Sequence, residues 1–234
     1  MSAPRQAVVT GGTGALGRAL VQELLGRGTR VAVPYTTESR WDELRRAAAA
    51  GAPLRGWRAD LSDPGAAAAF VDEAASWLGG LDAVAAIAGA YAGSAVLEKA
   101  PIEEWERMLR VNLGTVYAVC RAALPHLLEG GGSVVTVGAR LVETGGAGAA
   151  GYVVSKAGVQ ALTRVLALEN RDRGIRFNCV APAIIDTPDN RRAMPQADAS
   201  RWTSPAAIAR VIAFLLSADS APTTGATIPV DARG

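Results

Sequence analysis

The sequence predicts an α/β domain with a doubly wound Rossmann fold, in which helices cover both faces of a seven-stranded parallel sheet. Short apolar runs alternate with longer segments of helical periodicity through almost all of the 234 residues. A glycine-rich turn follows the first apolar run, and prolines stand where several helices should begin. This alternation implies right-handed βαβ units, and the length suits one domain spanning residues 1–234.

Each strand and helix can be placed from its apolar pattern and its flanking residues. Strands are expected at residues 7–10, 30–33, 54–57, 83–88, 133–137, 175–180 and 226–230. Helices are expected at residues 15–25, 41–50, 64–78, 101–128, 152–169 and 205–216. Pro64, Pro101 and Pro205 each fall in a first helical turn, where a missing N–H is tolerated. Residues 182–202 are rich in Pro, Asp, Asn and Arg, and we expect an irregular substrate loop or lid there.

Composition excludes several classes of function. The 24 basic and 22 acidic residues are scattered along the chain, so neither a nucleic acid nor a membrane is expected as a partner. His126 is the single histidine, which excludes histidine-rich metal sites, and no metal is predicted. Cys120 and Cys179 lie in apolar surroundings and are interpreted as buried free thiols. The chain starts without a long apolar stretch, so the expected localisation is cytoplasmic.

The glycine-rich turn predicts a dinucleotide site. Gly12, Gly14 and Gly17 form a G-x-G-x-x-G pattern, whose small residues let backbone N–H groups approach a pyrophosphate. The pattern alone is weak, since about 0.3 occurrences are expected by chance in a chain so rich in glycine. Its place between the first strand and the first helix favours the functional interpretation. The predicted contacts are Gly11, Gly12, Thr13, Gly14, Ala15 and Leu16.

The end of the second strand indicates which dinucleotide is bound. An acid about 20 residues after the glycines would bind the 2′-hydroxyl of NAD. Tyr35, Thr36 and Arg40 stand in that region instead, and hydroxyls and a guanidinium can receive the 2′-phosphate of NADP. NADP is therefore the predicted cofactor, and Glu38 leaves NAD possible.

Tyr152 and Lys156 form the strongest chemical signal. They stand four residues apart at the start of a predicted helix and therefore on one face of it. A Y-x-x-x-K pair is expected about 0.03 times by chance with so few tyrosines and lysines. A compact ammonium beside a phenol lowers the phenol pKa by charge proximity and can also bond ribose hydroxyls. We therefore expect proton transfer from Tyr152.

Further short motifs follow the later strands: Asp60 with Leu61, Ala88 with Gly89, Asn112 in Arg-Val-Asn-Leu, and Thr187 in Ile-Asp-Thr. Together with the glycine turn and the Tyr152–Lys156 pair, they resemble the short-chain dehydrogenase/reductase family over essentially the whole chain. The resemblance implies an NAD(P)-dependent oxidoreductase with the sheet order 3-2-1-4-5-6-7. It implies that Tyr152 donates the proton, that Lys156 lowers its pKa, and that Asn112 serves a proton relay. The further cofactor contacts that it implies are Asp60, Leu61, Ala88, Gly89, Pro182, Ile185 and Thr187.

Three positions depart from the pattern of that family. Ala139 stands thirteen places before Tyr152, where the family usually has a Ser that polarises the substrate carbonyl. Asn-Asn-Ala-Gly after the fourth strand reads Ala-Ile-Ala-Gly, and Pro-Gly after the sixth reads Pro-Ala. Loss of an oxyanion donor often costs about 2.7–4 kcal/mol. Thr136, Arg140 and Thr144 are the residues that could compensate.

One branch of the family, quinonoid dihydropteridine reductase, dispenses with that Ser. Residues 11–17, 88–93, 138–140 and, most specifically, 186–198 are similar to it. In that branch an aromatic at the position of Tyr91 faces the pterin, and the oxidised ring needs protonation more than carbonyl polarisation. The substrate residues that the resemblance implies are Tyr91, Ala139, Arg140, Asn190 and Met194.

Alternatives remain for the substrate and for the residues around it. A 3-oxoacyl thioester or another carbonyl compound is the second candidate substrate. A non-catalytic NADP-binding sensor is the alternative from another class, although a pure binder has no use for the Tyr152 phenol. Tyr91 can also be interpreted as a residue that caps the core, and Met194 as part of a surface turn.

The two longest predicted helices indicate a homodimer or a homotetramer. Residues 101–128 and 152–169 carry more small and apolar side chains than one face against a sheet needs. Those side chains include Val119, Ala122, Ala157, Val159, Ala161 and Leu162.

Overall fold

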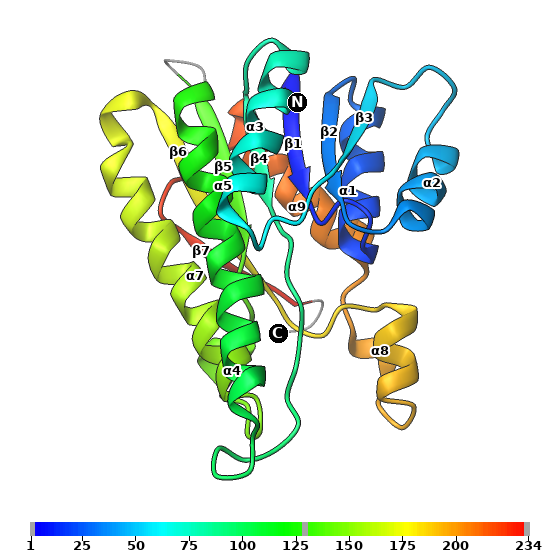
Figure 1. Ribbon diagram of the computed structural model, residues 1–234, viewed down its shortest axis with the longest axis vertical. Helices are drawn as coiled ribbons and strands as arrows, with labels where there is room; N and C mark the ends of the chain where they lie inside the picture. The colour runs from blue at the N-terminus through cyan, green and yellow to red at the C-terminus, as the bar shows by residue number, and fades with distance from the viewer. Residues whose placement is uncertain (1–2, 128–130, 232–234) are drawn as a thin grey trace.

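Seven parallel strands form one sheet within residues 3–127 and 131–231, which are the residues that the structure, a computed structural model, describes (Figure 1). The strands are β1 (Gln6–Thr10), β2 (Arg30–Tyr35), β3 (Leu54–Arg58), β4 (Ala83–Ala86), β5 (Gly132–Val137), β6 (Ile175–Pro182) and β7 (Thr227–Val230). Their order across the sheet is β3-β2-β1-β4-β5-β6-β7. The predicted Rossmann fold and the predicted strand order are both confirmed.

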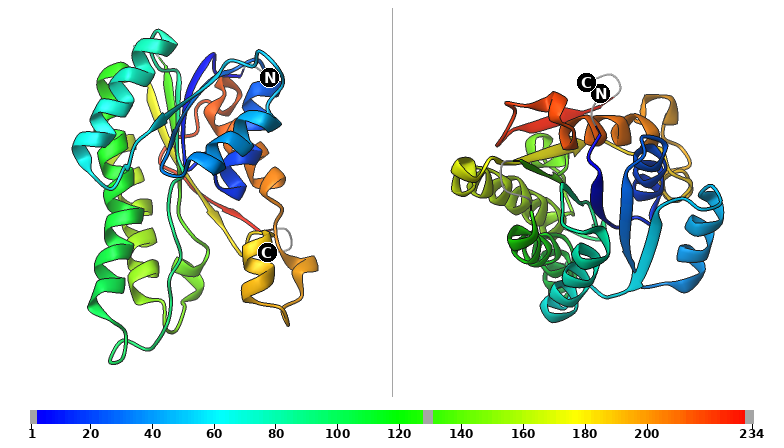
Figure 2. Two further views of the ribbon diagram at one scale, coloured as in Figure 1. Left: turned by 45° about the vertical axis from the view of Figure 1, so that its right-hand side comes forward. Right: turned by 90° about the horizontal axis from the view of Figure 1, so that it is seen from above.

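Helices cover both faces of the sheet, as the views of Figure 2 show. One face carries α1 (Ala15–Gly26), α2 (Glu38–Ala47) and α9 (Pro205–Leu216). The other carries α3 (Pro64–Leu78), α5 (Thr115–Ala123) and α7 (Ala150–Glu169). Each set buries its own apolar cluster against the sheet: Leu20 and Ile212 belong to the first cluster, and Phe70 and Val119 to the second. The sheet is thus covered on both sides, as a fully parallel sheet requires.

The segment predicted as one helix over residues 101–128 is divided. It contains α4 (Ile102–Met108), a π-helical turn (Leu109–Gly114), α5 and a 3-10 turn (Leu124–His126), while residue 128 lies outside the described residues. The π turn carries Asn112, whose amide bonds to the backbone of Ala90. Apolar periodicity did not reveal this break, because the helical pattern continues through the π turn. Such turns occur frequently at functional sites.

β4 ends at Ala86, before the predicted end at residue 88, and Thr10 supplies the reason. The Thr10 hydroxyl accepts the backbone N–H groups of Ile87 and of Ala88, both at 3.0 Å. Pairing between β4 and β5 therefore stops at Ala86. The strand order reverses between β1 and β4, which is where doubly wound sheets bind their ligands.

Residues 182–202, predicted to be irregular, contain a short helix, so that expectation is wrong in part. α8 (Pro188–Ala193) begins after Thr187, whose hydroxyl accepts the Asn190 N–H at 3.1 Å. A capping threonine followed by proline is a helix-start signal, which the polar composition of the segment concealed. A 3-10 turn (Ala199–Arg201) follows later in the segment.

The remaining boundaries differ from the predicted ones by a few residues. The helix predicted at residues 41–50 is α2, which begins earlier at Glu38 and ends at Ala47. β2 continues beyond its predicted end to Tyr35, and α6 (Leu141–Thr144) is an additional short helix. Cys120 and Cys179 are buried and free, as predicted. In the described part of the chain, none of the helices combines the length and the hydropathy needed to cross a bilayer.

Candidate active site

The glycine-rich turn after β1 leaves almost no room for side chains. Gly11 has a φ of +66°, a conformation that favours glycine. A Cβ on Gly17 would lie 2.0 Å from the Gly11 carbonyl oxygen, and a Cβ on Gly12 would lie 2.7 Å from Cγ1 of Val33. Gly14 precedes α1 and contributes no side-chain cap, so the first N–H groups of α1 are left for a ligand. This cradle fits the pyrophosphate of a dinucleotide.

The adenosine end of the predicted cofactor site lies at the ends of β2 and β3. Tyr35 stacks on Trp41, with ring centroids 5.4 Å apart and ring planes 4° apart. Burial raises the pKa of Tyr35, and the neighbouring Glu38 carboxylate raises it further. Thr36 and Arg40 are exposed beside this stack. The described side chains therefore offer an aromatic wall with hydroxyl and guanidinium groups at its edge.

The turn after β3 is held by its own side chain. The Asp60 carboxylate accepts the Ser62 N–H at 2.9 Å, and this hydrogen bond is the main cause of the lowered pKa of Asp60. Leu61 is buried beside it. The lowered pKa keeps Asp60 ionised, and its carboxylate stabilises the turn after β3.

Tyr152 and Lys156 lie on α7 across the end of β5. The Lys156 Nζ donates to the Val137 carbonyl oxygen at 2.8 Å and lies 6.0 Å from the centroid of the Tyr152 ring. Burial lowers the pKa of Lys156 to about 8. Burial, with a contribution from Tyr91, raises the pKa of Tyr152 to about 12. The shift of the phenol is opposite to the lowering that the family resemblance implies, because the ammonium bonds to Val137 and burial dominates.

Asn112 joins the loop after β4 to α7. Its Oδ1 accepts the Ala90 N–H at 2.8 Å, and its Nδ2 donates to the Ala90 carbonyl at 3.1 Å and to the Ser155 hydroxyl at 3.0 Å. A Cβ on Gly89 would lie 2.6 Å from that Oδ1 and 3.2 Å from the Lys156 Nζ. The Asn112 amide therefore holds the Ala90 backbone against α7, and the absence of a side chain at Gly89 leaves room for it.

Tyr91 and Ala139 are the predicted substrate residues that bear most on which groups surround the Tyr152 phenol. The Tyr91 ring meets the Tyr152 ring edge to face, with centroids 4.9 Å apart and an interplanar angle of 68°, and Tyr91 is 63% exposed. Ala139 is buried, and its carbonyl oxygen accepts Nε2 of Gln160 at 3.4 Å. The structure thus offers an exposed aromatic wall beside Tyr152 and a methyl group at the position of the missing hydroxyl.

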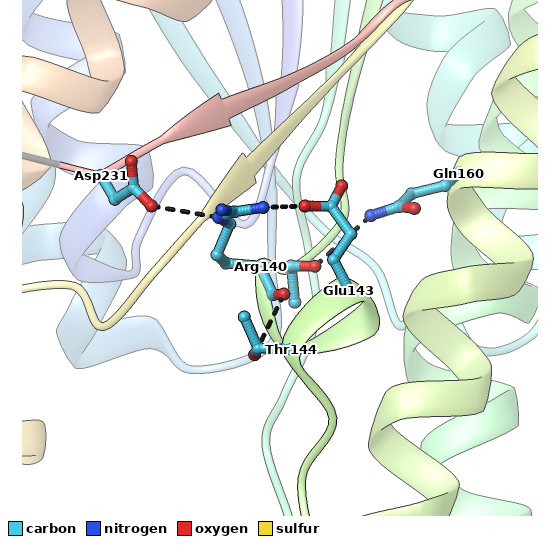
Figure 3. A network of polar contacts seen from close by, with 6 residues as sticks. Arg140, Glu143, Thr144, Gln160 and Asp231 are labelled. Carbon is cyan, nitrogen blue, oxygen red and sulfur yellow. Dashed lines mark hydrogen bonds and ion pairs between the residues drawn. The ribbon is translucent and has the colours of Figure 1, made fainter. Parts of the chain in front are cut away.

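The three residues that could compensate for that hydroxyl are bonded elsewhere. Thr136 is buried and shares a 2.7 Å hydrogen bond with Thr163. The Arg140 guanidinium pairs with Glu143 and donates to Asp231 at 3.1 Å (Figure 3). The Thr144 hydroxyl donates to the Arg140 carbonyl at 3.4 Å. All three of these side chains are therefore engaged in hydrogen bonds or ion pairs of their own in this structure.

The predicted nicotinamide and substrate residues within 182–202 are spread from the end of β6 to the end of α8. Nδ2 of Asn190 donates to the Ile185 carbonyl at 2.8 Å, and the Pro182 carbonyl accepts the Arg140 N–H at 2.9 Å. Thr187 caps α8, and Met194 is half-buried at its other end. Asn190 therefore braces this segment, and among the described residues no hydrogen bond joins Asn190 or Met194 to Tyr152.

Sequence reasoning missed Arg18, Ser155 and the carbonyl of Val137. Nε of Arg18 donates to the Thr13 carbonyl at 2.9 Å, and its guanidinium pairs with Glu43 on α2 at 2.6 Å. Arg18 follows the last glycine of the turn directly, and Ser155 stands three residues after Tyr152, so their positions were the available signals. The Val137 carbonyl carries no signal in the sequence.

Metal chemistry has no visible support among residues 3–127 and 131–231, where no three His, Cys, Asp or Glu side chains gather as a possible metal site. His126 is paired with Asp72 of α3, with 2.7 Å between Nε2 and Oδ1. The single histidine therefore lies at a helix end beside a carboxylate.

Known proteins resemble this chain over almost its whole length. A family model described as enoyl-(acyl carrier protein) reductase matches residues 12–232. The cis-4-hydroxycyclohexanecarboxylate dehydrogenase of Sinomonas cyclohexanicum is 34% identical, with 98% of this chain and 96% of that protein covered. The 3-oxoacyl-(acyl-carrier-protein) reductase FabG of Escherichia coli (strain K12) is 30% identical, with 96% and 95% covered.

Solved structures show the same likeness. Levodione reductase superposes with a TM-score of 0.90 at 27% identity, over 97% of this chain and 96% of that one. A Brucella melitensis protein described as a short-chain dehydrogenase/reductase has a TM-score of 0.86 at 31% identity, over 97% and 94%.

Burial of Lys156 predicts that stability rises with pH. The amine has its ordinary pKa of 10.5 in the unfolded chain and a pKa of about 8 in the fold, so the unfolded chain binds more protons between these values. Its contribution to the free energy of unfolding is complete above the unfolded pKa and is lost as the pH falls through the folded pKa. The change is at most about 1.4 kcal/mol per pH unit. Urea unfolding of the parent and of Lys156→Met at successive pH values between 8 and 10.5 measures it.

The expected result is a stability difference between parent and Lys156→Met that grows in favour of the parent as the pH rises. Lys99→Met, which changes an exposed lysine, is the matched control. A difference that stays constant across this range would contradict the burial of the amine.

Proposed function

The chain belongs to the short-chain dehydrogenase/reductase family and is therefore an NAD(P)-dependent oxidoreductase, and on that premise we propose that it reduces a conjugated, quinonoid acceptor of the dihydropterin type. The observation that carries the proposal is the buried methyl group of Ala139, where the family usually has a hydroxyl. Tyr152 donates the proton, and Lys156 and Asn112 support it.

Each residue of the proposed machinery has one chemical task. The nicotinamide, when bound, supplies the hydride. The Tyr152 phenol delivers the accompanying proton, and its high pKa keeps that proton in place until the acceptor takes up negative charge. The Lys156 ammonium has three N–H donors, of which one donates a hydrogen bond to the Val137 carbonyl. The other two are available to ribose hydroxyls and to the phenolate that forms.

A quinonoid acceptor suits a site with a single strong donor. A ketone concentrates charge on one oxygen, and a missing oxyanion donor costs about 2.7–4 kcal/mol in the transition state. A conjugated ring delocalises that charge, so it requires the proton from Tyr152 but no second hydrogen-bond donor. The exposed ring of Tyr91, edge on to Tyr152, offers a wall for a planar substrate.

A 3-oxo or other carbonyl substrate is the second candidate, and the relatives favour it. The similar proteins named above are a 3-oxoacyl-(acyl-carrier-protein) reductase and a dehydrogenase of a hydroxylated ring. The residue at position 139 distinguishes the two candidate substrates, because a ketone needs a hydrogen-bond donor there and a quinonoid ring does not.

Steady-state oxidation of NADPH tests the two substrates side by side. We expect turnover with quinonoid dihydropterin and little with an acetoacetyl thioester. Tyr152→Phe should abolish most turnover because it removes the proton donor, whereas Tyr117→Phe, an exposed tyrosine on α5, should not. Ala139→Ser should leave the quinonoid activity level or lower, since the added hydroxyl meets no oxyanion.

Two outcomes would overturn the substrate assignment. Efficient reduction of the thioester without reduction of the dihydropterin, with a further gain from Ala139→Ser, would establish the carbonyl substrate. Tight NADPH binding with no turnover of either acceptor would favour the non-catalytic sensor.

We propose NADP(H) as the cofactor, because cationic and hydroxyl groups surround the end of β2. Arg40 and Thr36 are exposed there, and Arg58 is near enough to Tyr35 to act on its pKa. Arg18 joins the glycine turn to α2 through Glu43 and the Arg40 carbonyl. A 2′-phosphate would meet guanidinium groups in this region, which favours it over a ribose hydroxyl.

Arg40→Ala should raise the dissociation constant of NADPH by about tenfold and leave that of NADH nearly unchanged, because it removes one charge-assisted contact to the phosphate. Fluorescence titration with both nucleotides measures the effect. Arg46→Ala, an exposed arginine in the last turn of the same helix, is the matched control. Tighter binding of NADH than of NADPH by the parent would show the assignment to be wrong.

We also propose a homodimer or homotetramer formed through the outer face of the π turn, α5 and α7. A shallow apolar groove there is lined by Leu113, Tyr117 and Leu162, with Glu106 and Arg110 at its side. Tyr117 is 54% exposed, and Leu168 of α7 is 66% exposed. In a two-fold interface the same groove faces itself, and opposite charges one helical turn apart can pair across it.

Light scattering should therefore give a mass of at least twice 24.0 kDa at micromolar concentration. Tyr117→Glu should shift the protein toward the monomer by placing a charge in the groove. Leu97→Glu, which changes an exposed leucine outside the groove, should leave the mass unchanged. A parent protein that is monomeric under these conditions would refute the interface.

A further inference from the structure

Ser155 is a buried hydroxyl between the two catalytic residues of α7, and the mechanism above gives it no task. It stands one residue before Lys156 and is 0% exposed. Its hydroxyl donates to the Tyr152 carbonyl oxygen at 2.7 Å. The Ser155 Oγ in turn accepts a hydrogen bond from Nδ2 of Asn112 at 3.0 Å.

The single proton of Ser155 decides which way the Asn112 amide faces. The Tyr152 carbonyl is a pure acceptor, so the Ser155 proton must go to it. Ser155 can then only accept from Asn112, which must present its NH2 to α7 and its oxygen to the Ala90 N–H. The 2.8 Å bond from the Ala90 N–H to Oδ1 agrees with that orientation.

The consequence reaches both tyrosines of the site. Ser155 holds the backbone of Tyr152 directly. Through Asn112 it holds Ala90, the residue before Tyr91, whose ring packs edge on against Tyr152. We propose that Ser155 is a positioning residue for proton transfer, which orients the Asn112 amide and thereby keeps Tyr91 in register with the Tyr152 phenol. The proposal rests on the Tyr152–Lys156 chemistry of the proposed function and not on which acceptor is reduced.

A purely structural role makes a different prediction. A helical serine often bonds a carbonyl one turn earlier, and that bond alone needs no partner on another element. The hydrogen bond from Asn112 is the feature that a helix does not need. A double-mutant cycle between Ser155 and Asn112 therefore separates the two roles.

Ser155→Ala should lower kcat by roughly ten- to hundredfold with little change in KM, because it misplaces the donor without removing a substrate contact. It should also shift the pH profile of kcat, whereas Ser155→Thr, which keeps the hydroxyl, should restore activity in part. Ser133→Ala is the matched control: Ser133 is equally buried, and its hydroxyl donates to the Leu215 carbonyl at 2.8 Å, on another part of the sheet. The assay uses whichever of the two acceptors the parent reduces.

Asn112→Ala combined with Ser155→Ala should be no slower than Asn112→Ala alone, since both changes break one chain of hydrogen bonds. Additive losses, or a Ser155→Ala enzyme as fast as the parent, would overturn the proposal. If Ser155→Thr fails to fold because its methyl group has no room, the double-mutant cycle between Ser155 and Asn112 still distinguishes a positioning role from a purely structural one.

A second measurement needs no substrate, so failure of the proposed acceptor cannot be confused with failure of this inference. The side-chain amide protons of Asn112, assigned by their loss in Asn112→Asp, should exchange slowly with solvent in the parent. They should exchange faster in Ser155→Ala and at the parental rate in Tyr152→Phe. Protection that persists in Ser155→Ala would overturn the proposal.

Discussion

A lysine ammonium buried against a backbone carbonyl is the interaction on which the rest of the site depends. Removing Lys156 from water is costly, and the Val137 carbonyl is the partner that makes the burial tolerable. That carbonyl is available because the β4–β5 ladder stops at the pair Ala86–Thr136. The N–H groups that would continue β4 go to the Thr10 hydroxyl instead. Thr10, at the end of β1, thus leaves the Val137 carbonyl free to accept the hydrogen bond from Lys156 of α7.

The end of the pairing between β4 and β5 also determines which segments lie near the Tyr152 phenol. The chain after β4 is free to run past the π turn, where Asn112 clasps Ala90 and sets the start of the segment that carries Tyr91. On the other side, β5 ends at Val137 and the chain runs on to Ala139, whose neighbour Arg140 pairs with Glu143 and Asp231 (Figure 3). Asn112, Ser155 and Lys156 of this site are buried, and Ala139 adds no side-chain hydrogen-bond donor. With Tyr152 as the proton donor that we propose, this arrangement favours an acceptor that delocalises its charge over one that concentrates it on an oxygen.

The fold and the helical placement of Tyr152 and Lys156 could be predicted because they depend on local periodicity. Strand alternation, helix-start prolines and the four-residue spacing of Tyr152 and Lys156 are all visible along the chain. The features that position those residues were not visible, because they arise from contacts between distant segments. Thr10 with Ala88, Asn112 with Ser155, and Lys156 with Val137 are separated by 19 residues or more. The capped helix α8 is the exception, since Thr187 followed by Pro188 was a local signal that the polar composition hid.

Lys156 is a buried amine whose pKa is lowered by its burial, and the composition of the chain permits a direct measurement. Lysine is present only at positions 99 and 156, so protein labelled with ¹³C at lysine Cε gives two resonances, which Lys156→Met assigns. Titration by NMR should find the Lys156 amine losing its proton near pH 8. A Lys156 amine with the ordinary pKa of 10.5 would show that the amine is not buried in this way.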